Sequence, residues 1–181
     1  LKNIYSKYSK TARYYNARGI CELKIKRLKK AKFFFDFSLS LKKYVPALNN
    51  LAVIYYLSGD FQKAFLLLKE AKSTRSLGTP YYNFGLILHR LGMYKKSVVA
   101  LEKIGDKNEE FDKVNVLLGI NYLILNKLDK AELSFSKVQN SKIFAFQLNV
   151  ALLEFLKGAG ENAINRLMKI SPANKNQRNV W

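Results

Sequence analysis

The sequence predicts an all-α fold built from consecutive helical hairpins, and three observations lead to this prediction. Apolar residues recur at the three- and four-residue spacing of amphipathic helices. Turn-forming residues interrupt these stretches, and the whole pattern returns at intervals of 32 to 34 residues. Sustained alternation of apolar and polar residues, which would indicate β-strands, is scarce. A chain of 181 residues is long enough for one domain with a continuous core.

The clearest hairpin is the stretch Leu48–Ala71. Its two apolar sets are separated by Ser58-Gly59-Asp60. Glycine suits the left-handed conformation that ends many helices, and Ser and Asp favour caps and turns. Ala52 and Ala64 are expected where the two helices cross, because larger side chains there would force the helices apart.

The pattern of this hairpin resembles the tetratricopeptide repeat, whose period is about 34 residues. Two further clear copies follow, a weaker copy closes the chain, and a degenerate copy precedes them. Their matching residues are Tyr81, Phe84, Gly85, Leu88, Gly92, Tyr94, Ser97 and Leu101; Leu118, Gly119, Tyr122, Leu125, Leu128, Ala131 and Phe135; Val150, Ala151, Gly158, Ala163 and Leu167; and Tyr15, Gly19, Leu28, Ala31 and Phe35. The resemblance implies a right-handed α-solenoid of about five hairpins.

The two outer copies depart from the family pattern. Arg18 and Glu22 replace apolar residues in the first copy, and Gln147 and Glu154 replace a bulky residue and an aromatic one in the last. Terminal repeats are often atypical because they cap the stack. In the fourth copy, Asn126 stands in place of the turn glycine, and we expect the turn to survive because Asn tolerates a positive φ.

The expected organisation has three parts: a basic N-terminal extension, a single solenoid domain and a polar tail. Their expected boundaries are residues 1–11, 12–175 and 176–181. Five repeats are expected near residues 12–44, 45–77, 78–111, 112–143 and 144–175.

The formal net charge of +19 is the most unusual bulk feature of the chain. Residues 1–44 hold 13 Lys and Arg against two acidic residues, with the densest run at Lys24–Lys32. Such a balance attracts nucleic acid, acidic proteins or anionic lipids. The alternative is an AT-rich genome, whose codons favour Lys, Asn and Ile. Both interpretations stay open.

Nothing in the sequence indicates an enzyme, a metal or a cofactor. Cys21 and His89 are single representatives of their types, so neither an internal disulfide nor a structural zinc site can be built. No apolar run reaches the ~18 residues of a membrane span, and no signal peptide is visible. We expect a soluble domain, cytoplasmic or associated with the cell envelope, and no small-molecule substrate. The start at Leu1 suggests a fragment of a longer chain.

The family resemblance implies that the first helices of the repeats line a concave groove. The polar half of the expected groove consists of Arg13, Asn16, Lys24, Asn49, Tyr56, Tyr82, His89 and Arg90. The apolar half consists of Val116, Ile120, Leu123, Ile124, Leu148, Leu152, Phe155 and Leu156. An exposed apolar surface of this length is typical of an interaction site. The alternative is that tight curvature buries these residues against one another.

The resemblance therefore predicts a protein–protein interaction scaffold that captures a partner helix or extended peptide in its groove. The partner segment could belong to another protein, to a second copy, or to the rest of this chain. The alternative function is a basic helical-repeat module that binds RNA or another polyanion, since other helical repeats of similar period read RNA. An anionic membrane surface is a further possible partner.

Overall fold

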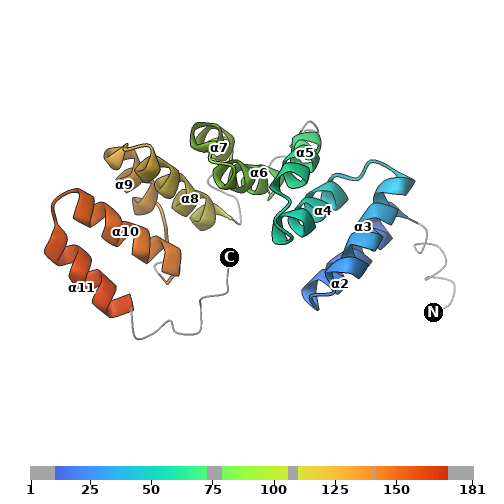
Figure 1. Ribbon diagram of the computed structural model, residues 1–181, viewed down its shortest axis with the longest axis horizontal. Coiled ribbons are helices and arrows are strands. Elements are labelled where there is room, and N and C mark those ends of the chain that lie inside the picture. Colours follow the sequence, from blue (N-terminus) through green and yellow to red (C-terminus); the bar gives the residue numbers. More distant parts are fainter. Residues whose placement is uncertain (1–10, 73–78, 106–109, 141, 171–181) are drawn as a thin grey trace. The chain divides into compact units, whose positions relative to one another are not determined.

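The computed structural model describes residues 11–72, 79–105, 110–140 and 142–170, and these residues form ten α-helices and no β-strand (Figure 1). The all-α fold class is therefore confirmed. The N-terminal extension 1–10 and the tail 171–181 lie outside the described residues. The chain divides into two compact units, Leu1–Gly92 (unit 1) and Met93–Trp181 (unit 2). The single domain over 12–175 and its repeat boundaries stay predictions.

Each unit is a series of helices that contact their neighbours in the chain. Unit 1 contains α2 (Ala12–Lys24), α3 (Leu28–Leu41), α4 (Val45–Leu57), α5 (Phe61–Lys72) and α6 (Thr79–Arg90). Unit 2 contains α7 (Tyr94–Leu101), α8 (Phe111–Ile124), α9 (Leu128–Ser136), α10 (Phe144–Leu156) and α11 (Gly160–Ile170). Within unit 1 the closest partners are α2 with α3 and α4 with α5, and within unit 2 they are α8 with α9 and α10 with α11.

The turns between paired helices use residues with positive φ. Gly59 and Gly158 adopt φ values of 79° and 84°. Asn126 adopts φ 55°, so the prediction that Asn replaces the turn glycine is confirmed. Lys26, between α2 and α3, adopts φ 60° and was not anticipated from the sequence. Because a β-carbon makes this conformation unfavourable, the packing of α2 on α3 must hold Lys26 in place.

Polar side chains mark where helices begin and where they meet. The Thr11 hydroxyl caps α2 by accepting a hydrogen bond from the Tyr14 backbone N–H at 3.2 Å. The buried Ser38 hydroxyl on α3 donates to the Ala12 carbonyl on α2 at 2.6 Å. The Thr11 bond satisfies an N–H group at the helix start that has no intrahelical partner, and the Ser38 bond ties the first residue of α2 to α3.

Small residues set the spacing of the paired helices. The ring of Phe35 on α3 lies against the backbone of Gly19 on α2, and the ring of Phe135 on α9 lies in the same way against Gly119 on α8. A β-carbon at either glycine would overlap the ring. In the pair α4–α5 the corresponding positions are Ala52 and Leu68, both buried. A glycine is thus matched with a phenylalanine and an alanine with a leucine.

The crossing residues Ala52 and Ala64 are also buried, as the sequence predicted for them. Ala52 is 1% exposed and Ala64 is fully buried. A core cluster of unit 1 is formed by Ala31, Phe35, Leu51 and Ile54. This cluster joins α3 to α4, so the hydrophobic core continues from one hairpin to the next.

Two side-chain hydrogen bonds join α7 to α8 inside unit 2. The Asn121 amide donates to the Ser97 hydroxyl at 2.9 Å, and both side chains are buried. The Tyr122 hydroxyl donates to Oε1 of Glu102 at 2.5 Å. Burial of the hydroxyl, and to a smaller extent its hydrogen bond to the Glu102 carboxylate, raise the pKa of Tyr122 to about 12.

The contact between Gly119 and Phe135 predicts a clash that a matched substitution relieves. We expect Gly119→Ala to lower the free energy of unfolding by about 1–3 kcal/mol, despite the better helix propensity of alanine, because the ring must move. Adding Phe135→Leu, which reproduces the Ala52–Leu68 combination, should recover part of this loss. Urea unfolding followed by circular dichroism measures both effects.

Gly105→Ala is the control for this prediction, because nothing lies within 4 Å of a β-carbon built at Gly105. We expect its free energy of unfolding to change by less than about 0.5 kcal/mol. Equal losses from Gly119→Ala and Gly105→Ala would contradict the role given to the small residue.

The raised pKa of Tyr122 predicts a pH dependence of stability. In the unfolded chain a tyrosine ionises near pH 10, whereas in the folded chain Tyr122 stays protonated up to about pH 12. The folded state therefore holds a proton that the unfolded state has lost, and its stability falls as pH rises through this interval. Below about pH 10 the contribution is fully present.

The measurement is the difference in urea midpoint between the wild type and Tyr122→Phe as a function of pH. Taking the difference removes the titration of the other tyrosines and the lysines. We expect the wild type to lose more stability than Tyr122→Phe above about pH 10. Parallel profiles for the two proteins would contradict the prediction.

Candidate functional site

The polar half of the expected groove contains a series of paired amides in unit 1. The Asn50 amide on α4 donates to Oδ1 of Asn16 on α2 at 3.0 Å, and the Asn83 amide on α6 donates to Oδ1 of Asn49 on α4 at 2.9 Å. Each pair joins residues 34 positions apart. Asn16 and Asn49 are buried, so these two side chains link every second helix, α2 to α4 and α4 to α6, rather than forming an open surface.

A third contact of the same span joins Arg90 and Tyr56. Arg90 Nε donates to the Tyr56 hydroxyl at 3.1 Å, and the guanidinium lies 5.8 Å from the centre of the tyrosine ring. Arg90 is exposed, so it can still bind an anionic group while it stays in contact with Tyr56. The remaining polar positions are arranged as expected for a surface: Arg13 and Lys24 are exposed, and Tyr82 and His89 are half-buried.

The apolar half of the expected groove lies in unit 2 and is exposed chiefly on α10. Leu148, Leu152, Phe155 and Leu156 are between 45% and 65% exposed. Their spacing of four, three and one residues places them on one face of the helix. Ile124, at the end of α8, is exposed to a similar degree.

On α8 the corresponding side chains are largely covered. Val116 and Leu123 are buried, and Ile120 is half-buried. These three positions correspond to Leu148, Phe155 and Leu152 of α10, which lie 32 residues later. Because Val116 and Leu123 are buried, they do not belong to a solvent-facing groove. The alternative of tight curvature predicted such burial for all residues of the apolar half. The exposed apolar surface is therefore narrower than expected and centred on α10.

A comparison of equivalent residues shows how α11 differs from the earlier second helices. Phe35, Leu68, Leu101 and Phe135 occupy one repeat position and are at most 4% exposed. Leu167, their equivalent on α11, is 41% exposed. The last described pair thus presents apolar side chains to solvent at a position that the earlier pairs bury.

Sequence reasoning missed the contribution of α11 to this surface. Ile164, Leu167 and Met168 are all exposed on α11, and Ala163 and Ile170 are buried. The signal was present in the sequence, because residues 164, 167 and 168 have the spacing of one helix face. It was obscured because the family pattern assigns Leu167 to the core.

The charges beside this surface are paired with one another. Arg166 on α11 forms a two-pronged contact with Glu154 on α10, with Nη2 at 2.6 Å from Oε1 and Nε at 3.0 Å from Oε2. The Glu154 carboxylate raises the pKa of Arg166, chiefly through these hydrogen bonds. Lys157, which directly follows α10, contacts Glu132 on α9 at 2.5 Å. The pair Glu154–Arg166 explains why a carboxylate replaces the aromatic residue expected at position 154.

The described residues offer no metal centre and no membrane-spanning helix. Within residues 11–170, apart from the gaps in the description, no group of three or more His, Cys, Asp or Glu side chains could hold a metal ion. No described helix is long and apolar enough to cross a bilayer. Cys21 is exposed on α2, and His89 is half-buried on α6.

Comparisons with known proteins identify the repeat and the fold. The family model described as "Tetratricopeptide repeat" matches residues 79–104. A comparison with curated proteins finds no match. Among solved structures, YrrB, a tetratricopeptide repeat protein described as having an unusual peptide-binding site, is similar with a TM-score of 0.75 and 19% identity, over 96% of this chain and 93% of that one.

Two further structures show the same similarity of fold. MamA from Desulfovibrio magneticus RS-1 has a TM-score of 0.75 and 17% identity, over 88% of this chain and 92% of that one. PilF from Pseudomonas aeruginosa has a TM-score of 0.78 and 15% identity, over 92% of this chain and 78% of that one. Together with the tetratricopeptide repeat matched at residues 79–104, the paired helices of the described residues and the similarity of fold to these structures confirm the resemblance seen in the sequence.

Proposed function

We propose that the chain is a protein-interaction scaffold that captures an amphipathic helix or apolar segment of a partner on the exposed face of α10 in unit 2. The observation that carries this proposal is the row Leu148, Leu152, Phe155 and Leu156, which is exposed on one helix face. Apolar side chains gathered on one surface in this way are typical of interaction sites.

The shape of the row favours a helical partner. An amphipathic helix presents anchors at positions i, i+3, i+4 and i+7, and such a stripe can pack along the stripe on α10. On α8 the equivalent positions of Leu148 and Phe155 are buried by neighbouring helices, which supports the idea that a helix fits against this repeat position. The paired charges of Glu154 and Arg166 leave the surface beside the row without a large unbalanced charge.

The similarity to YrrB supports the proposal at the level of the fold. That protein is described as having a peptide-binding site, and the proposal extends peptide or protein binding to this chain. The exposed cations Arg13, Lys24 and Arg90 of unit 1 form a second proposed contact surface, suited to acidic segments. In this function the chain supplies surfaces for assembly, and no reacting group is assigned to it.

The proposal predicts that a charge on the α10 face weakens partner binding. We would select amphipathic helical peptides from a displayed library and measure their affinity by fluorescence anisotropy. Leu152→Asp is expected to weaken binding by about tenfold or more, because the carboxylate must be desolvated in the apolar contact. Circular dichroism should show unchanged helicity, since Leu152 is about half exposed.

Leu133→Asp on α9 is the matched control, because Leu133 is more exposed than Leu152 and belongs to the same unit. Its peptide affinity should stay within about twofold of the wild type. Peptides that bind both variants equally well would rule out the α10 face, as would a library that yields no binder tighter than about 100 µM.

A further inference from the structure

A ridge of exposed apolar side chains runs along α3 in unit 1. Phe33, Phe37 and Leu41 are spaced by four residues, and they are 61%, 38% and 46% exposed. They lie on the side of α3 opposite the buried Phe35, which faces α2. These three residues, called the α3 ridge here, therefore project away from the core of the hairpin.

The repeats show that this ridge is not a requirement of the fold. Phe33 corresponds to Leu66, Val99 and Leu133, which are also apolar and 56% to 61% exposed. The position of Phe37, in contrast, holds charged residues in the other repeats: Glu70, Lys103 and Lys137. The described second helices that carry these positions thus share one exposed apolar residue. Among them, only α3 has another exposed apolar residue one helical turn later.

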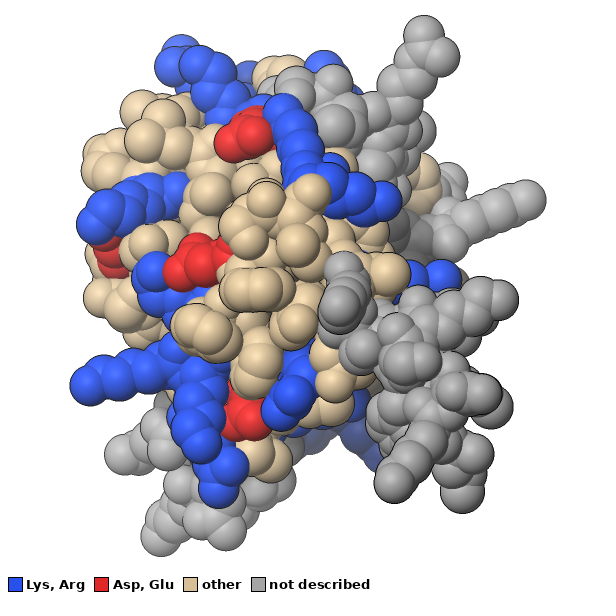
Figure 2. All heavy atoms as spheres, turned by 90° about the vertical axis from the view of Figure 1, so that its right-hand side faces the viewer, with Lys and Arg blue, Asp and Glu red and all other residues tan. Residues whose placement is uncertain are grey.

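The surroundings of the ridge are strongly basic. Unit 1 contains 18 Lys and Arg against 4 Asp and Glu. Lys29 and Lys30 are exposed on α3 itself, whereas Asp36, the acid of this helix, is paired with Lys32 at 2.6 Å. Figure 2 views the structure from the side that carries α2 and α3 and shows more Lys and Arg than Asp and Glu side chains around uncharged residues. The charge favours an anionic partner.

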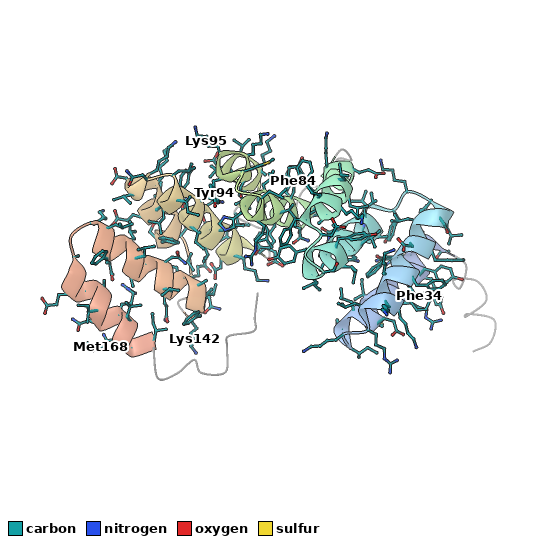
Figure 3. All side chains as sticks on the ribbon, viewed as in Figure 1. Phe34, Phe84, Tyr94, Lys95, Lys142 and Met168 are labelled. Carbon is teal, nitrogen blue, oxygen red and sulfur yellow. The ribbon has the colours of Figure 1, made fainter. Side chains whose placement is uncertain are left out.

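The aromatic rings of the ridge pack on one another, which decides between two kinds of anionic partner. The ring centres of Tyr15 and Phe37 lie 4.3 Å apart, and the Tyr15 ring also stacks on that of Phe34. The Arg18 guanidinium lies 4.5 Å from the centre of the Phe34 ring. Figure 3 shows Phe34 in this group on the α2–α3 pair. Binding of single-stranded nucleic acid requires ring faces on which bases can stack. Phe33 and Phe37 contact each other, Phe34 and Tyr15 at interplanar angles of 32° to 71°, so these rings form one packed cluster rather than separate platforms for stacking bases.

We propose that the α3 ridge docks on an anionic lipid bilayer, with α3 lying in the plane of the interface. Phe33, Phe37 and Leu41 enter the boundary between headgroups and acyl chains, which accommodates phenylalanine and leucine side chains. Lys29 and Lys30 contact the anionic headgroups. A projecting ridge suits a flat surface better than it suits a peptide, which needs a groove.

Two other segments that could cover the α3 ridge, residues 1–10 and a second copy of the chain, match its positive charge less well than a bilayer does. Residues 1–10 of this chain contain three Lys and no acidic residue, so they are repelled by the same surface. A second copy would bring an equally basic unit 1 against the first. An anionic bilayer neutralises the charge of the ridge and covers its apolar side chains in one contact.

The test is sedimentation of the whole chain with vesicles of phosphatidylserine and phosphatidylcholine in a ratio of about 3:7. We expect Phe33→Ser combined with Phe37→Ser to weaken vesicle binding about tenfold or more. The matched control is Leu66→Ser combined with Leu133→Ser, which removes two side chains as exposed as Phe33 from the positions equivalent to Phe33 on α5 and α9. The control should bind within about twofold of the wild type.

Two further measurements keep the test independent of folding. Lys29→Gln combined with Lys30→Gln leaves the rings in place and should weaken binding severalfold and reduce its salt dependence. The second measurement uses Phe37→Trp in a chain that also carries Trp181→Phe, so that the ridge holds the only tryptophan. Its fluorescence emission should shift to shorter wavelengths when vesicles are added. Lipids that carry a quencher in the acyl chain should reduce this fluorescence.

Several results would overturn the proposal. Equal binding to vesicles of phosphatidylcholine alone would exclude recognition of anionic lipid. Equal losses in the two serine pairs, or no loss in either, would exclude the α3 ridge. If the Phe33→Ser, Phe37→Ser pair lost binding to single-stranded RNA but kept binding to vesicles, the ridge would be a nucleic-acid surface instead.

Discussion

The structure depends on how closely two antiparallel helices approach each other, and this distance is set by the pairing of a small residue with a large one. Phe35 and Phe135 lie directly on the backbone of Gly19 and Gly119. Where the small residue is Ala52, the large residue is Leu68. In the pairs α2–α3, α4–α5 and α8–α9 the larger ring thus accompanies the smaller residue, as expected for interiors packed to crystal-like density. Helix spacing is thereby kept within each pair, and the core can continue into the next helix.

The fold could be predicted from the sequence because its determinants are local and repeated. The apolar spacing, the turn residues Gly59 and Gly158, and the small residues at the crossings each appear in several copies, so errors in one copy are corrected by the others. Lys26 shows the limit of this reasoning. It adopts the turn conformation without the residue type that signals it, because tertiary packing overrides the local preference.

The candidate surfaces were predicted less completely, because exposure depends on what neighbouring helices cover. Val116 and Leu148 occupy one repeat position and carry similar side chains, yet the first is buried and the second exposed. The sequence contains no signal for this difference. Glu154 is a second example: its pairing with Arg166, twelve residues away on another helix, explains a departure from the family pattern that spacing alone could not explain. The phenylalanines at positions 33, 34, 35 and 37 are too many to be expected on a surface, so the sequence predicts them in the core and at the next interface. That prediction is wrong for Phe33 and Phe37, which are exposed on α3.

The paired asparagines of unit 1 restrict how this part of the chain can change in length. Asn50 faces back to Asn16 on α2, and its neighbour Asn49 faces forward to Asn83 on α6. One residue inserted early in α4 would rotate both amides by about 100° about the helix axis, and both connections would break together. Insertions and deletions in unit 1 therefore keep the amide contacts only if they fall in loops or comprise a complete hairpin. The array thus changes length in discrete modules.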